Sequence, residues 1–131
     1  MLGRTYRFQI LNSTGQTLAA SVNTITARRE KRGSDGSLTF ESSETTVFSN
    51  GSTQATGTYA NGSTIDNSTD EWEGGAFTVS ITAPASSSGD VVVRLQRSTD
   101  AGTTWPDDGT GTIVRVINFT TSGTKKRNFY L

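Results

Sequence analysis

Hydrophobic and polar residues alternate in several short segments of this chain. In Arg4–Leu11 the residues Tyr6, Phe8 and Ile10 share one face, with polar side chains between them. A period of two is typical of a β-strand that buries one face, and no segment has the period of a helix. The same pattern, less regular in places, predicts strands at Thr17–Arg29, Ser37–Ser43, Thr45–Ser49, Gln54–Ala60, Ala76–Ala83, Val91–Arg97, Ile113–Thr120 and Lys126–Leu131.

Three segments lead to more specific expectations. Thr17–Arg29 is predicted to be one long strand with a bulge, because its apolar series changes phase between Val22 and Ile25. Ile113–Thr120 is almost continuously apolar, which predicts a central strand covered on both faces. Asn61–Gly75 has no alternation and is expected to be a loop, the kind of segment that often carries contacts.

Turn signals separate the predicted strands. Asp35 and Gly36 favour a hairpin, and Ser37–Ser43 and Thr45–Ser49 follow as the next strand pair. About eight to ten short strands predict an all-β fold, an antiparallel β-sandwich or jelly-roll-like single domain over residues 1–131. This length cannot supply the blades of a β-propeller. The residues assigned to the core are Tyr6, Phe8, Phe77, Val79, Val93 and Leu95.

Composition and charge exclude several partners. Hydrophobic residues are only 31% of the chain, so the core should be thin, as it is between two sheets. Twelve Lys and Arg balance twelve Asp and Glu, which gives no electrostatic case for nucleic acid. The basic clusters Arg28–Arg32 and Lys125–Arg127 are expected as solvated charges of turns or edge strands. No run of about 18 apolar residues occurs, so we expect no membrane span.

The residue types also limit the chemistry. The chain has no His and no Cys, which excludes His bases, thiolate metal sites and Ser-His-Asp triads. The acidic residues that could serve glycoside hydrolysis or calcium binding are set among Ser, Gly and Asp, as is typical of solvated turns. We therefore expect no enzyme activity, no cofactor and no metal site. These acidic residues are Asp66, Asp70, Glu71, Glu73, Asp100, Asp107 and Asp108.

The most patterned stretch of the chain is RSTDAGTTWPDD. Within it Ser98, Asp100, Gly102, Thr104 and Trp105 have the spacing of an Asp box, known from sialidase propellers as a structural turn. We expect Asp100 to accept hydrogen bonds from its own loop and Gly102 to have a positive φ. Ser98 and Thr104 are expected to bond across the hairpin base, with Trp105 packed beneath the turn. The arginine triad and tyrosine nucleophile of a sialidase have no counterpart here.

The longer segment VVVRLQRSTDAGTTWPDD resembles one that is common in structural proteins of tailed-phage virions. The start YRFQILNSTGQTLAA, the middle STIDNSTDEWEGGAFTVSITAPASSSGDV and the end NFTTSGTKKRNFYL are similar to the same group, so the resemblance covers most of the chain. It implies a non-enzymatic virion protein, first of all a capsid decoration (cement) protein that binds and stabilises the head shell. A neck, tail or fibre component is the alternative.

The resemblance also implies partners and a location. The partners would be the major capsid protein or other virion proteins, and the chain itself would form a homo-oligomer, taken to be a trimer. The protein would be made in the cytoplasm of the bacterial host and lie on the outer head surface. The absence of Cys, and of an apolar leader after Met1, agrees with that expectation. No catalytic residue is carried over.

Two alternatives remain open. A carbohydrate-binding β-sandwich for host attachment would need two or three aromatic residues on one exposed face, whereas most aromatics here are expected in the core or in turns. Trp72 lies in the acidic loop, where it either anchors an interface or packs on its own sandwich.

Overall fold

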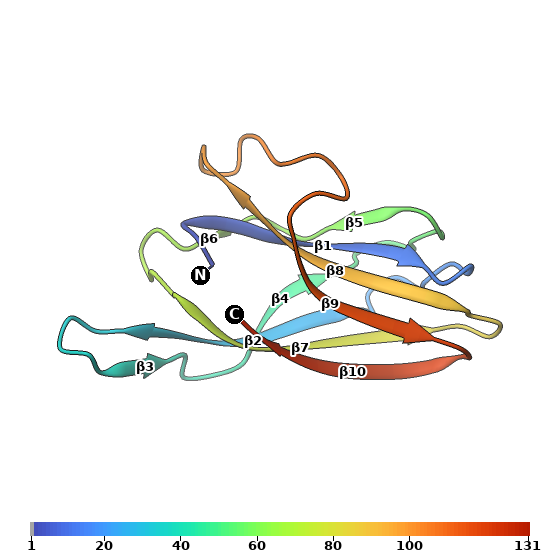
Figure 1. Ribbon diagram of the computed structural model, residues 1–131, viewed down its shortest axis with the longest axis horizontal. Coiled ribbons are helices and arrows are strands. Elements are labelled where there is room, and N and C mark those ends of the chain that lie inside the picture. Colours follow the sequence, from blue (N-terminus) through green and yellow to red (C-terminus); the bar gives the residue numbers. More distant parts are fainter. Residues whose placement is uncertain (1) are drawn as a thin grey trace.

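The computed structural model describes residues 2–131, and Met1 lies outside the described residues. The described chain forms one all-β domain of two antiparallel five-stranded sheets, packed as a sandwich without a helix, which confirms the predicted fold class (Figure 1). In chain order the strands are β1 (Thr5–Ser13), β2 (Thr24–Arg32), β3 (Leu38–Phe40), β4 (Thr45–Ser49), β5 (Tyr59–Asn61), β6 (Ile65–Asp66), β7 (Gly74–Ala83), β8 (Gly89–Ser98), β9 (Thr112–Phe119) and β10 (Gly123–Tyr130).

The pairing of the strands is nested. The first sheet has the order β5-β1-β8-β9, with β6 also paired to β1, and the second has the order β10-β7-β2-β3, with β4 also paired to β2. Because β1 pairs with β8 and β2 with β7, the chain doubles back on itself in the manner of a jelly roll. The edge strands β9 and β10 therefore come to lie at the same side of the sandwich (Figure 1).

The core lies between the sheets, and its centre is aromatic. All six residues assigned to it from the alternation are at most 1% exposed, so that prediction is confirmed. The ring of Phe8, from the first sheet, lies 5.5 Å from that of Phe77 and 6.1 Å from that of Phe129, both from the second. Phe77 and Phe129 stack on each other at 5.1 Å. These rings join the two sheets directly.

The prediction of one long strand at Thr17–Arg29 is wrong. β2 begins only at Thr24, and Val22 is exposed. The physical reason lies at Asn23, whose buried side-chain oxygen accepts a hydrogen bond from the backbone N–H of Thr82 at 2.8 Å. A side chain here takes the place of a ladder bond, so the β-branched residues before it do not join the sheet.

The predicted bulge lies in β4 rather than in β2. Ile25 pairs with Phe48 and Thr26 with Thr46, which leaves Val47 as the extra residue. Val47 and Phe48 are consequently both buried, although they are adjacent in the sequence.

The segments at Ser37–Ser43 and Thr45–Ser49 contain β3 and β4, but these strands do not pair with each other. Both pair with β2 on the edge away from β7, one after the other along it. The hairpin of β2 and β3 projects beyond the end of the first sheet (Figure 1). Leu38 and Phe40 therefore remain exposed, because no strand covers them.

The expected central strand at Ile113–Thr120 is an edge strand. β9 pairs with β8 alone, and the chain then crosses to the second sheet as β10. The other edge of β9 therefore has no strand partner. Ile113 and Val116 are 55% and 48% exposed. The expected loop at Asn61–Gly75 contains β6 and the start of β7, and the weak strand at Gln54–Ala60 contributes only an isolated bridge and the beginning of β5.

The aromatic contact between the sheets predicts a stability difference between two phenylalanines. Phe8→Ala is expected to lower the free energy of unfolding by about 3–5 kcal/mol, because it leaves a cavity at the centre of the core. The matched control is Phe40→Ala, whose ring is 51% exposed and whose expected change lies within about 0.5 kcal/mol. Urea unfolding followed by circular dichroism measures both. Equal losses in the two variants would contradict the role given to Phe8.

Candidate binding surfaces and the Asp-box turn

The Asp-box residues close a turn directly after β8. Asp100 Oδ1 accepts hydrogen bonds from Ser98 Oγ at 2.7 Å and from Thr104 N at 2.9 Å, and its Oδ2 accepts one from Thr104 Oγ1 at 2.6 Å. Ser98 Oγ in turn accepts a bond from Gly102 N at 2.8 Å. Ser98 and Thr104 thus both bond to Asp100, rather than to each other across the hairpin base as expected.

The hydrogen bonds of this turn stabilise the charged form of Asp100. The bonds from Thr104 and Ser98, that from the Thr104 hydroxyl first, lower the pKa of Asp100 to about 2. Its pKa in an unfolded chain is about 3.9, so folding favours the carboxylate. The resulting stabilisation is fully present above about pH 4 and is lost as the pH falls through about 2. Asp100 is therefore ionised near neutral pH, in the form that accepts these hydrogen bonds.

Two further residues set the shape of the turn. Gly102 has a φ of +88° and Ala101 one of +58°, so the backbone turns through the left-handed region. Trp105, expected beneath the turn, lies instead on the neighbouring strand β1, where the Arg7 guanidinium carbon is 4.5 Å from its ring centroid. The ring is half-buried. The indole thus covers polar surface of the first sheet and not the core.

The rest of the connection from β8 to β9 lies on the outer face of the first sheet. Gln9 donates to Asp108 Oδ1 at 2.8 Å and accepts from Gly109 N at 3.0 Å. Gln96 donates to the Thr110 carbonyl at 3.0 Å. Both glutamines point away from the core, as the alternation predicts, yet neither is exposed. The loop buries them and satisfies their polar groups, which fastens it to the sheet.

Trp72 packs on its own sandwich. Asn67 holds its backbone from both sides, accepting from Trp72 N and donating to Trp72 O, each at 2.8 Å. The half-buried ring rests against the core, with Lys31 Nζ at 5.1 Å and the Arg29 guanidinium carbon at 5.8 Å from its centroid. The ring N–H is buried without a hydrogen-bond partner among the described residues. The further role of Trp72 at an interface stays a prediction.

Beside Trp72 lies a largely buried ion pair that sequence reasoning missed. Arg29 of β2 bonds to the Glu41 carboxylate and donates to the Tyr6 hydroxyl at 3.2 Å. The bond to Glu41 raises the pKa of Arg29, whereas burial raises that of Tyr6. Burial alone would raise the pKa of Glu41, but the hydrogen bonds from Arg29 outweigh it and lower the pKa. A signal existed, since Arg29 continues the inward series of Ile25 and Ala27.

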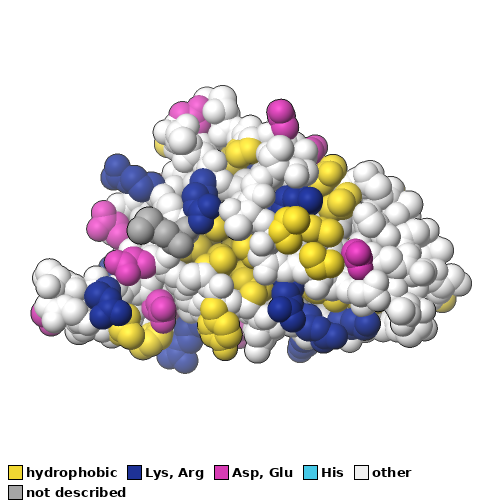
Figure 2. All heavy atoms as spheres, viewed as in Figure 1, with side chains coloured by type: hydrophobic (Ala, Val, Ile, Leu, Met, Phe, Trp, Pro, Cys, Tyr) yellow, Lys and Arg dark blue, Asp and Glu magenta, His cyan; other side chains and the backbone are white. Residues whose placement is uncertain are grey.

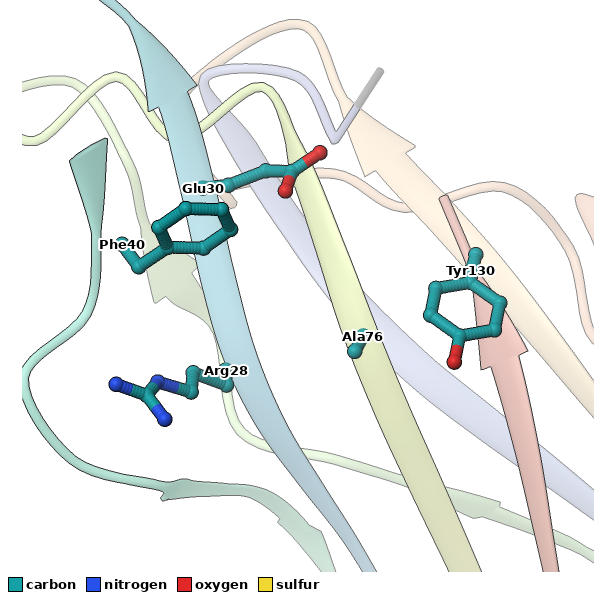
Figure 3. A pocket seen from close by; sticks show the side chains of 5 residues that line it. All are labelled: Arg28, Glu30, Phe40, Ala76 and Tyr130. Atoms are coloured by element: carbon teal, nitrogen blue, oxygen red, sulfur yellow. The ribbon is translucent and has the colours of Figure 1, made fainter. Parts of the chain in front are cut away.

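A groove of about 420 Å³ crosses the outer face of the second sheet. Phe40 of β3 and Tyr130 of β10 stand at its two sides, with Ala76 of β7 between them (Figure 3). The Glu30 carboxylate leans across β7, while the Arg28 guanidinium points away from Tyr130 and donates to the Glu41 carbonyl (Figure 3). Tyr130 is 76% exposed. The aromatics of this groove were not expected on a surface.

An apolar row crosses the outer face of the first sheet. Tyr59, Leu11, Val92 and Val116 are paired neighbours on β5, β1, β8 and β9, so their side chains lie on one face. Ile113 extends the row along β9. Figure 2 shows hydrophobic side chains gathered over these strands.

The acidic residues considered for chemistry are dispersed. Asp108 is bonded to Gln9, and Glu71 and Glu73 lie beside Trp72. Within residues 2–131 no three His, Cys, Asp or Glu side chains gather as a metal site requires. No helix in the same part of the chain could span a membrane.

Comparisons with protein-family models, with curated proteins and with solved structures give no match for this chain. The features that bear on function are therefore its own surfaces, namely the groove, the apolar row and the edges beside them.

The geometry of the Asp-box turn predicts the effect of Gly102→Val. A Cβ at this position would lie 2.8 Å from Thr64 Cγ2, and the positive φ is unfavourable for a β-branched residue. We expect a loss of about 1–3 kcal/mol in the free energy of unfolding, measured by thermal unfolding. Gly36→Val is a control at a similar φ with open space around the Cβ, so it separates the cost of the positive φ from that of the contact with Thr64. A melting temperature unchanged by Gly102→Val would contradict the positive φ.

Proposed function

We propose that this chain is a non-enzymatic structural protein of a tailed-phage particle, first of all a decoration protein that binds and stabilises the head shell. The observation that carries the proposal is the exposure of large apolar side chains on both outer faces of the sandwich. These are Ile113 and Val116 on the first sheet and Leu38, Phe40 and Tyr130 on the second. Apolar residues gathered on a surface mark contacts with other macromolecules, and two such faces suit a protein that bridges its neighbours.

The small core is consistent with this role. A partner that binds only the folded state adds to its stability, so a subunit embedded in a shell can fold around few apolar residues. The partners would be the major capsid protein or other virion proteins, with the chain itself assembled as a homo-oligomer such as a trimer on the outer head surface. A neck, tail or fibre component has the same requirements and differs in the number of copies.

The proposal predicts the abundance of the chain in purified particles. A decoration protein should be present at a copy number comparable with that of the major capsid protein, because it repeats with the symmetry of the shell. Quantitative mass spectrometry of particles measures this ratio directly. A handful of copies would move the chain to the neck, tail or fibres, and its absence from the particles would refute the virion role.

The groove between Phe40 and Tyr130 supports a second candidate function, the binding of carbohydrate on the host surface. Two exposed rings can stack on the apolar faces of sugar residues, and the Glu30 carboxylate between them can accept hydrogen bonds from hydroxyl groups. Sugar-binding sandwiches need this arrangement of aromatics on one open face.

A glycan array tests this second function. If a glycan binds, Phe40→Ala and Tyr130→Ala should each weaken its binding by about tenfold or more, since each removes one stacking ring. Trp72→Ala is the control, because its ring lies outside the groove and packs against the core. Binding that is lost in the Trp72 variant and kept in the other two would place the sugar elsewhere, and no binding on the array would remove this candidate.

A further inference from the structure

The two sheets end side by side at β9 and β10, and on this open side of the sandwich most backbone groups along the outer edge of β9 have no strand partner. β9 is the last strand of the first sheet and has eight residues. Within residues 2–131, one hydrogen bond reaches its free edge from outside that sheet, donated by Lys125 Nζ to the Asn118 carbonyl at 2.6 Å. The other backbone groups on this edge are available to a further strand.

The remaining edges differ from β9 in ways that prevent strand addition. On the opposite side, β3, β5 and β6 have three, three and two residues, and β4 has five with a bulge at Val47. β9 also has a register shift, at Val114, but it pairs regularly with β8 over the five residues Arg115–Phe119. β10 carries Lys125, Lys126 and Arg127 in succession. β9 has a single charged residue, Arg115, and exposes Ile113 and Val116. It alone has the length and the apolar surface that a bound strand requires.

Cations line the open side next to this edge. Arg115 pairs with Val93, Lys125 with Ile81 and Arg127 with Val79, all three partners being core residues. Paired residues point the same way, so these three cations occupy inward positions at the mouth between the sheets. The only ion pair among the described residues joins Arg29 and Glu41, so none of these three cations has an acidic partner. Figure 2 shows Lys and Arg side chains over β10, next to the hydrophobic ones.

These cations determine which strand can be added. A second copy of the chain docked edge to edge would bring Lys125, Lys126 and Arg127 close to their equivalents, and like charges repel. A neutral strand would leave the cations without counter-charges. An acidic strand would gain backbone hydrogen bonds from β9, apolar contact with Val116 and ion pairs with the basic residues.

We propose that the β9 edge binds an extended acidic segment of another protein, which adds to the first sheet as a further strand. A polypeptide fits better than a nucleic acid, because only a polypeptide pairs with the backbone of β9 and packs on Ile113 and Val116. The formal net charge of +0 gives no general attraction for polyanions. The inference goes beyond the proposed function, since this surface binds the same chemistry whether or not the chain belongs to a phage particle.

The test uses the full chain and labelled peptides of eight residues, the length of β9. A peptide of alternating valine and glutamate is expected to bind about tenfold more tightly, or more, than the same peptide with lysine in place of glutamate. N-methylation of its backbone amides should abolish binding, because it removes the strand hydrogen bonds. Fluorescence anisotropy measures the affinities, and amide chemical shifts should change along β9 and not at the Phe40–Tyr130 groove.

Charge reversal supplies the matched variants. Arg127→Glu should remove or invert the preference for the glutamate peptide; its side chain is exposed and bonds only to the adjacent Lys126 carbonyl. Arg32→Glu makes the same charge change at the distant β2–β3 hairpin and should leave the preference intact. Circular dichroism confirms that both variants are folded.

Four results would overturn the inference. They are equal binding of the glutamate and lysine peptides, binding that survives N-methylation, a DNA duplex bound as tightly as the glutamate peptide, and dimerisation of the free chain through β9 in analytical ultracentrifugation. The copy number in particles is independent of all four, so failure of one proposal is distinguishable from failure of the other.

Discussion

The contact of Phe8 with Phe77 and Phe129 holds the two sheets together, and the rest of the structure depends on it. Every contact between two aromatic rings among the described residues belongs to this one cluster, to which Tyr6 adds an edge-on neighbour of Phe8. In a chain that is only 31% hydrophobic, no second aromatic layer supports the sandwich. The nested pairing of β1 with β8 and of β2 with β7 brings these rings to its centre. The outer faces and the open side are positioned by that centre.

Away from the core, hydrogen bonds from polar side chains hold the loops and turns in place, a role that apolar packing has in chains with more hydrophobic residues. Asp100 closes its own turn, Asn67 holds the backbone on both sides of Trp72, and Gln96 fastens a loop to the sheet. Each such bond satisfies a group that would be costly to bury alone. The connections are thereby held against the sheets, so the surfaces between them keep a defined shape. Long loops on a thin sandwich would otherwise leave those surfaces undefined.

The surfaces that bear on function share an origin in the edges of the sheets. Phe40 lies on a short edge strand beyond the first sheet, and Tyr130 and Val116 lie on the two strands of the open side. Apolar residues are thus exposed where strand pairing ends. Charge then discriminates between partners, because Lys125 and Arg127 repel the basic residues of a second copy of the chain and attract acidic segments. The exposure of these apolar residues could not be predicted from the sequence, in which Ile113–Thr120 has the pattern of a strand covered on both faces.

The sequence by itself determined most of the strands, their inward faces and the position of the Asp-box turn. Alternation at Tyr6, Phe8 and Phe77 is a local property of an extended backbone, and the Asp-box spacing places donors and acceptor within one loop. The tertiary structure decided which faces are covered. Gln96 is polar and buried because a loop lies on it, whereas Val116 is apolar and exposed because its part of the outer face of the first sheet is not covered. Alternation records which residues share a face, while the exposure of that face depends on pairing between residues far apart in the chain.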